Sequence, residues 1–180
     1  MSSAASGSAR LQIFNRNPIQ TTVQLVANML SAKAKYAFKA MFALARLGPG
    51  ALLQSQEISE KENISKKFLD LILLELRGHG LVRSFRGQRG GYALAKPPSE
   101  ITLGQIVRII DGPLAPIACA SVTAYRRCTD CKNEAECLVR QSMKRVRDAA
   151  SDILDNTTLE SALAMEKSRK KKTARRKAAA

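Results

Sequence analysis

The spacing of apolar residues predicts a mainly helical chain. Residues 33–47 place six apolar side chains on one helical face, and the Gly48-Pro49-Gly50 triplet ends that helix. A short helix is expected over 55–62 with Ser55 as its N-cap, and a third runs from Ser65 to about residue 78. The buried stripe expected for the third helix is Phe68, Leu69, Ile72, Leu73 and Leu76.

Two short strands are expected after the third helix. Leu81-Val82 and Tyr92-Ala93-Leu94 have strand character, and the Gly-rich basic turn RGQRGG lies between them. His79, between two glycines, is interpreted as a helix-end residue. Two helices, a recognition helix and a basic hairpin form the plan of a winged helix-turn-helix domain.

The C-terminal part is expected to contain two helices and a final short one. Thr102 and Gln105 fit a capping box for a helix reaching about Asp111, and Thr157 and Glu160 fit another before LESALA. From residue 138 on, apolar residues recur at spacings of four and three. This seam indicates either pairing with a second copy or packing inside one subunit, and its members are Val139, Met143, Val146, Ala150 and Ile153.

These patterns give a mainly α fold: a winged helix-turn-helix with a two-stranded β-wing and a long C-terminal dimerisation helix. The expected organisation is a disordered extension over 1–28, the winged-helix domain over 29–98, a connecting helix over 99–115, a cysteine loop over 116–137, the dimerisation and short terminal helices over 138–164, and a disordered basic tail over 165–180. Met29 opens the first well-patterned segment and is an alternative start of the chain.

Charge points to a polyanionic partner. The net charge is +15, and the tail 167–177 holds eight Lys or Arg and no acid, which leaves 22 basic against 15 acidic residues elsewhere. No run is long and apolar enough to span a membrane, and the N-terminus lacks a signal peptide, so a reducing, cytoplasmic setting is expected. The sequence contains no nucleophile–base pair and no phosphate loop, so an enzyme is not expected.

The third helix and the wing carry the residues expected to contact double-stranded DNA. Early helix residues that stay polar can meet base edges in the major groove, and arginines on a thin loop can enter the minor groove. These residues are Ser65, Lys66, Lys67 and Asp70 on the helix, and Arg86 and Arg89 at the wing tip. A general, basic nucleic-acid-binding protein is the competing interpretation.

All four cysteines, Cys119, Cys128, Cys131 and Cys137, lie within nineteen residues in the spacing C-x8-C-x2-C-x5-C. Clustered thiols in a polar loop favour metal ligation, because thiolates suit iron–sulfur clusters and zinc. The spacing alone supports an iron–sulfur cluster and zinc equally, and a metal-free redox switch through Cys128 and Cys131 comes third.

The stretches LSAKAKYA (30–37), ISKKFLDLILLELRGHGLVRSFRGQRGGYAL (64–94), ITLGQIV (101–107) and TLESAL (158–163), together with the cysteine loop, resemble the Rrf-two superfamily of bacterial winged-helix regulators, the group of IscR, NsrR and RirA. The resemblance implies a homodimer on a near-palindromic operator. It further implies that Arg86 enters the minor groove and that Lys67, Phe68 and Asp70 occupy base-reading positions. IscR has other side chains at the first two of these positions, so a different operator is expected.

The resemblance also favours an iron–sulfur cluster, with [2Fe–2S] preferred over [4Fe–4S]. Members carry three cysteines here, matched by Cys119, Cys131 and Cys137. Their fourth ligand is a histidine at the position of Arg140 or an aspartate at the position of Lys35, and neither cation can replace it. Cys128 is therefore expected as the fourth ligand. The implied function is a redox-, iron- or nitric-oxide-sensing transcriptional regulator, with a repressor preferred over an activator; structural zinc or a small effector is the alternative.

Overall fold

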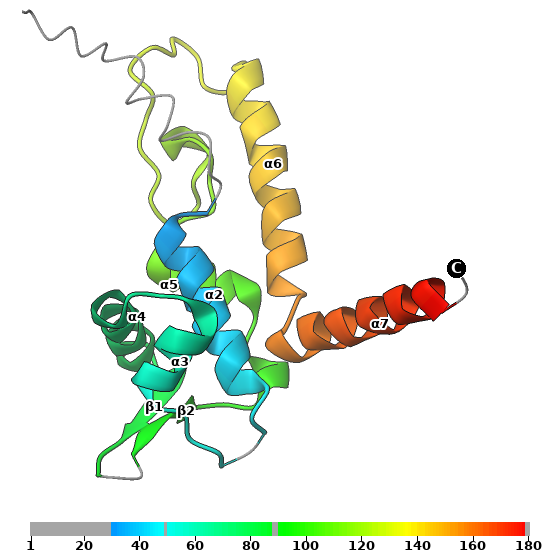
Figure 1. The fold of residues 1–180 in the computed structure, drawn as a ribbon. Coiled ribbons are helices and arrows are strands. Elements are labelled where there is room, and N and C mark those ends of the chain that lie inside the picture. Colours follow the sequence, from blue (N-terminus) through cyan, green and yellow to red (C-terminus); the bar gives the residue numbers. More distant parts are fainter. Residues whose placement is uncertain (1–29, 49, 88–89, 179–180) are drawn as a thin grey trace, which may run out of the picture.

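The computed structural model describes residues 30–48, 50–87 and 90–178. The expected N-terminal extension, the alternative start at Met29 and the wing residue Arg89 lie outside these ranges. These ranges contain six α-helices and one two-stranded sheet. The first four helices and the sheet form a winged-helix domain, and the last two helices lie beyond it (Figure 1). The mainly α winged-helix fold predicted from the sequence is confirmed.

Helix α2 (Ala32–Ala45) is the central helix of the core. The Ser31 hydroxyl caps it by accepting a 3.0 Å hydrogen bond from the Ala34 amide. Ala37, Ala40 and Met41 are fully buried, as the apolar spacing predicted, and Ala34 is buried as well. Small alanines on this face let the neighbouring helices approach closely, so α2 packs against both α4 and α5.

Helices α3 (Ser55–Glu62) and α4 (Lys66–Gly78) form the helix-turn-helix pair. The N-cap of α3 is Gln54 rather than the predicted Ser55, and the Glu57 carboxylate accepts from the Gln54 amide at 2.7 Å. Asn63 ends α3 in the left-handed conformation, which suits asparagine. Ser65 stands at the N-cap position of α4 as predicted, but its side chain makes no capping hydrogen bond.

Strands β1 (Val82–Phe85) and β2 (Gly91–Leu94) form the antiparallel wing, with Val82 paired to Leu94 and Phe85 to Gly91. A bridge between Leu53 and Tyr92 joins the wing to the loop before α3. A β-carbon on Gly91 would lie 2.8 Å from the Leu53 carbonyl oxygen, so only glycine fits there.

Helix α5 (Leu103–Ile110) follows the short 3-10 helix η1 (Pro98–Glu100). The predicted capping box is present, because the Thr102 hydroxyl accepts from the Gln105 amide at 3.2 Å. Its Ile106 and Val107 are buried. Helix α5 thus packs its apolar face on α2 and α4 and turns Arg108 toward the C-terminal helices.

Helix α6 (Leu138–Asp155) stands beside the winged-helix domain, and α7 (Leu159–Ala178) runs away from it (Figure 1). Two expectations are corrected here. The cap of α7 is formed by Thr158 and Ser161, whose amide and hydroxyl groups bond reciprocally, instead of Thr157 and Glu160. The tail expected to be disordered from residue 165 is helical to Ala178, because it is rich in Ala, Lys and Arg and has no Gly or Pro.

No helix among the described residues is long and apolar enough to cross a membrane. The exposed long helices α6 and α7 instead carry many charged side chains.

Candidate functional site

The first turn of α4 presents polar side chains over a buried apolar face. Ser65, Lys66 and Lys67 are exposed, while the predicted stripe below them is buried at Leu69, Ile72, Leu73 and Leu76. Lys66 forms an ion pair with Asp70 at 2.9 Å. This pair partly neutralises both groups, whereas the adjacent Lys67 is exposed and has no such ion pair among the described residues.

Phe68 differs from its neighbours because it is half-buried. Its ring packs edge-on against Tyr36 of α2, with 5.9 Å between ring centroids. This contact holds α4 on α2. A base-reading role for Phe68 stays a prediction, and a structural role is already evident.

Two leucines of α4 that the sequence reasoning did not single out are exposed. Leu71 is 55% and Leu74 is 53% exposed, one and two turns beyond Lys67. The signal was present in the run Leu71-Ile72-Leu73-Leu74, which is too apolar for a helix with one buried stripe. Apolar groups in the major groove can contact thymine methyl groups.

The wing holds Arg86 exposed at its tip. The base of the wing is fixed to α4, because Arg77 donates to the Ser84 hydroxyl at 3.0 Å. His79 is the exposed C-cap of α4, which agrees with its interpretation as a helix-end residue. This hydrogen bond links the third helix of the domain to the wing, and both carry exposed cations.

The cysteine segment connects α5 to α6. Cys119 lies in the 3-10 helix η2 (Ala118–Ala120) and is buried, whereas Cys128, Cys131 and Cys137 are half-buried. The Cys131 and Cys137 sulfurs lie 3.5 Å apart. Among the described residues, no three His, Cys, Asp or Glu side chains are arranged to hold a metal ion. The fold thus brings two thiols into direct contact and leaves the four-thiolate set incomplete in this conformation.

The pKa values of the two adjoining thiols are shifted in opposite directions. Hydrogen bonding to Cys137, followed by loss of solvent contact and by hydrogen bonding to Cys128, raises the pKa of the Cys131 thiol to about 12. The main-chain amide of Arg140 donates to the Cys137 sulfur at 3.5 Å and lowers the pKa of that thiol. Cys137 is the N-cap of α6, where a thiolate is favoured by the unpaired amides of the first turn.

Arg140 is the residue of this segment whose role sequence reasoning missed. Its Nε donates to the Cys119 main-chain oxygen at 2.9 Å, and its guanidinium lies 6.0 Å from the centre of the Tyr125 ring. Tyr125 in turn donates to the Glu134 carboxylate, which lies 3.9 Å from Arg140. Arg140 therefore ties both ends of the cysteine segment to α6, and its position had indicated only that it could not be a ligand.

Polar contacts also join α6 to the winged-helix domain. Arg108 of α5 contacts the Asp155 carboxylate with two hydrogen bonds of 2.5 and 2.8 Å and also reaches Ser151. Arg147 donates to the Ala120 carbonyl oxygen. Three of the five predicted seam residues point elsewhere, since Val139, Val146 and Ile153 are 63%, 43% and 65% exposed, while Met143 and Ala150 are half-buried.

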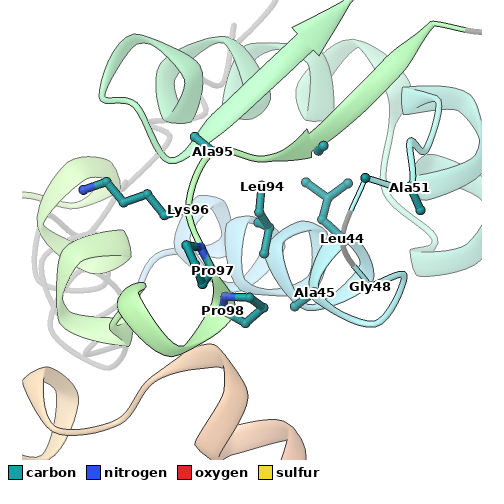
Figure 2. Close-up of a pocket in the computed structure, with 11 residues that line it drawn as sticks. Leu44, Ala45, Gly48, Ala51, Leu94, Ala95, Lys96, Pro97 and Pro98 are labelled. Carbon is teal, nitrogen blue, oxygen red and sulfur yellow. The ribbon is translucent and has the colours of Figure 1, made fainter.

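An apolar cavity lies where α2 meets the end of the wing (Figure 2). It measures about 310 Å³, and Leu44 and Leu94 project toward one another inside it. The chain that leaves β2, Ala95 to Pro98, forms one wall. The cavity is large enough for a small apolar ligand and adjoins the base of the wing.

A basic helix-turn-helix with a wing, carried beside a long exposed helix, defines a transcriptional regulator that binds DNA. The chain belongs to the Rrf2 family, described as an iron-dependent transcriptional regulator, whose profile matches residues 30–165. It is 43% identical over 140 residues to an Rrf2-like regulator of Rhodobacter capsulatus, covering 76% of this chain and 93% of the relative.

Two solved structures are similar in fold as well as sequence. CymR, the global cysteine regulator of B. subtilis, shares 32% identity with a TM-score of 0.63, over 76% of this chain and 96% of CymR. IscR of T. potens shares 26% identity with a TM-score of 0.59, over 79% and 90% of the two chains. These relatives are regulators and not enzymes, and the same holds for this chain.

Proposed function

We propose that this chain is a homodimeric, operator-specific regulator that holds an iron–sulfur cluster on Cys119, Cys128, Cys131 and Cys137 and works in the cytoplasm. The observation that carries the proposal is the pair of thiols at the start of α6, with sulfurs 3.5 Å apart. The family description as iron-dependent supports iron over zinc.

The donor chemistry of the segment fits such a cluster. Two thiolates bound to one tetrahedral metal at ~2.3 Å lie about 3.8 Å apart, close to the separation of Cys131 and Cys137. The pKa of Cys137 is lowered, which favours the ligating thiolate. A bound cluster supplies a redox-sensitive and nitric-oxide-sensitive group. We prefer [2Fe–2S], and an all-cysteine set accommodates [4Fe–4S] as well.

Cys128 is the fourth ligand in this proposal. It already influences the pKa of Cys131, so its thiol lies beside the contacting pair. Arg140 stands at the position where some relatives carry a ligating histidine. It donates a hydrogen bond to the Cys119 carbonyl oxygen and so supports the cysteine segment without being a ligand. A local rearrangement would have to bring the four thiols together, because Cys119 is buried and no three of the described His, Cys, Asp or Glu side chains are grouped to hold a metal ion.

The link from the cysteines to DNA runs through α6. Cys137 caps this helix, and Arg140 and Arg147 bond to the carbonyls of Cys119 and Ala120. A cluster held by the four cysteines would fix this attachment, and without it α6 would be free to change its position on α5. The recognition helices of the two subunits would then no longer match the half-site spacing, and operator affinity would change. We favour repression as the regulatory outcome.

Dimerisation is proposed to use the exposed seam of α6. Val139, Val146 and Ile153 recur every seven residues on one side, while Arg140, Arg147 and Ser151 face the same subunit. The subunit alone leaves the apolar side in water, and a second copy would cover it. Lys67 and Asp70 would read bases, and Arg86 with Arg89 would enter the minor groove.

The decisive experiment is purification without oxygen, followed by a visible spectrum and assays of iron and sulfide. We expect a coloured protein with iron and sulfide in equal amounts and with a spectrum that Cys128→Ser alters. A colourless protein with one zinc per chain would contradict the cluster, and an unchanged Cys128→Ser spectrum would exclude Cys128 as a ligand. Separately, Arg86→Ala should weaken operator binding by roughly 5- to 150-fold.

Metal-free control by a small effector is a second candidate. The cavity between Leu44 and Leu94 adjoins the base of the wing, and the relative CymR is described as a global cysteine regulator. A ligand there could shift the wing relative to α4. This candidate would be favoured if protein free of iron and zinc bound its operator and a small molecule changed that binding. Leu94→Trp, which fills the cavity, should then remove the response.

A further inference from the structure

The last turns of α7 form a cationic helix that the family profile does not include. The profile ends at residue 165, whereas α7 continues to Ala178. Residues 167–178 contain eight Lys or Arg and no Asp or Glu. Their charge is more than half of the net +15 of the chain.

The cationic part begins where α7 leaves the body of the subunit. Glu166 is its last acidic residue, and it pairs with Arg46 at the end of α2 at 2.9 Å and with Lys170 at 2.6 Å. Beyond it, the described side chains from Lys167 to Thr173, and Arg175, are all exposed. The helix points away from the winged-helix domain (Figure 1). The pair Arg46–Glu166 therefore anchors a projecting, unpacked helix.

The distribution of charge in this helix suits a polyanion. Lys167, Lys171 and Arg175 repeat every four residues, a spacing at which like charges repel and destabilise a helix. No partner carboxylate occurs between residues 167 and 178. An external array of negative charge would remove this repulsion and stabilise the helix at the same time.

One side of the helix also forms a hollow of suitable chemistry. Arg169, Lys172, Thr173 and Arg175 line it. Three cations and a hydroxyl spread over about 9 Å of helix match the spacing of one or two neighbouring phosphates along a strand. The residues are otherwise Ser, Thr and Ala, so no apolar face is present to enter a membrane or a protein core.

We propose that the C-terminal half of α7 is a second DNA-binding element, which contacts phosphates of double-stranded DNA without reading sequence. It rests on the proposed function only in that the winged helix brings DNA to the same chain. Once one subunit has bound, the tethered helix meets DNA at high effective concentration. The winged helix then selects the site, and α7 adds salt-dependent affinity on any sequence.

The test compares full-length protein with a variant in which Arg169, Lys171, Lys172 and Arg175 are all changed to Gln. Glutamine keeps helix propensity, and Lys170 is left in place because it pairs with Glu166. The matched control exchanges Arg and Lys at the same four positions and so keeps every charge. Binding is measured from 50 to 300 mM salt on a duplex selected from a random pool and on a scrambled duplex of equal length.

For the Gln variant we expect log affinity to fall less steeply with log salt. The magnitude of the slope should decrease by about 2–4 on both duplexes, and the control should keep the wild-type slope. Equal slopes for all three proteins would overturn the second element. If the Gln variant reduced the magnitude of the slope on single-stranded RNA or anionic vesicles but not on DNA, the second DNA-binding element would be overturned as well. If neither duplex is preferred by any of the proteins, the proposed operator-specific function fails, while the slopes still report on α7 independently.

Discussion

Arg140 donates from its Nε to the main-chain oxygen of Cys119 at 2.9 Å, so the first turn of α6 is tied to the buried helix η2. The amide of the same residue donates to the Cys137 sulfur. One arginine thus connects the first and last cysteines of the segment to the long helix. Its contacts explain how a cation at this position, which was expected not to be a ligand, still supports the same segment.

Replacing Arg140 with Ala should loosen the cysteine segment while the winged-helix core stays folded. A hydrogen bond from a charged donor contributes about 1.5–3 kcal/mol, so amide exchange in 119–137 should accelerate about tenfold or more. Hydrogen exchange measured by mass spectrometry would report this. The control is Arg145→Ala, an exposed arginine of the same helix, and equal exchange in both variants would contradict the role of Arg140.

The Arg108–Asp155 pair should make stability depend on pH at the acid end. The Arg108 guanidinium holds the pKa of Asp155 below its ordinary value of 3.8. A lowered folded-state pKa stabilises the fold above the unfolded pKa, and this contribution disappears as pH falls through the folded value. Thermal unfolding of wild type and Asp155→Asn should therefore differ at pH 6, and the difference should shrink as the pH falls below 3.8.

The difference in stability between wild type and Asp155→Asn should be modest, since the side chains of Arg108 and Asp155 are 38% and 43% exposed. An exposed pair contributes about 1 kcal/mol or less. A double-mutant cycle with Arg108→Gln would isolate it. A difference between wild type and Asp155→Asn that persists unchanged at pH 3 would show that the effect does not come from the charge of Asp155.

Ile153→Asp should abolish the proposed dimer without unfolding the subunit. Ile153 is 65% exposed in one subunit, so the change is tolerated there, while a second copy would bury the new charge in an apolar contact. We expect the dimer dissociation constant to rise at least about 100-fold, ~2.7 kcal/mol, by sedimentation equilibrium. Arg145→Asp, an exposed site off the seam, is the control, and a dimeric Ile153→Asp protein would refute the seam.

Gly91→Ala should destabilise the wing, and Gly78→Ala should not. The new β-carbon at 91 would lie 2.8–2.9 Å from the Leu53 backbone, which cannot move like a side chain, so a loss of about 1–3 kcal/mol is expected. Gly78 is helical with nothing near its missing β-carbon, and alanine there should be neutral or stabilising. Urea unfolding of both variants checks this, and equal midpoints would disprove the close approach.

Lys67 and Phe68 should respond differently to alanine although they are adjacent. Lys67 is exposed, so Lys67→Ala should reduce DNA affinity by roughly 5- to 150-fold at unchanged stability. Phe68 packs on Tyr36, so Phe68→Ala should cost about 2–4 kcal/mol of stability. Unfolding and DNA-binding titrations of both, with exposed Lys61→Ala as control, separate the roles. A destabilised Lys67→Ala protein would contradict its placement.

Local patterns predicted most elements of the fold. The alanine-rich face of α2, the capping box of Thr102 and Gln105, and the glycines after α4 act within a few residues, so the sequence carries their signal directly. The N-cap residues of α3 and α7 were each missed by one residue, because several polar residues could cap these helices. The helical tail was missed because charge favoured disorder over helix propensity.

The amino-acid sequence by itself determined the winged-helix plan, the polar face of the recognition helix and the four-thiol segment, since each depends on periodicity or spacing along the chain. Only the tertiary structure decided that Phe68 is half-buried against Tyr36, that Cys131 and Cys137 touch while Cys119 is buried, and that Arg140 and Arg147 turn the apolar seam of α6 outward. The physical reason is that these contacts join groups from different elements, and their distances depend on how those elements pack.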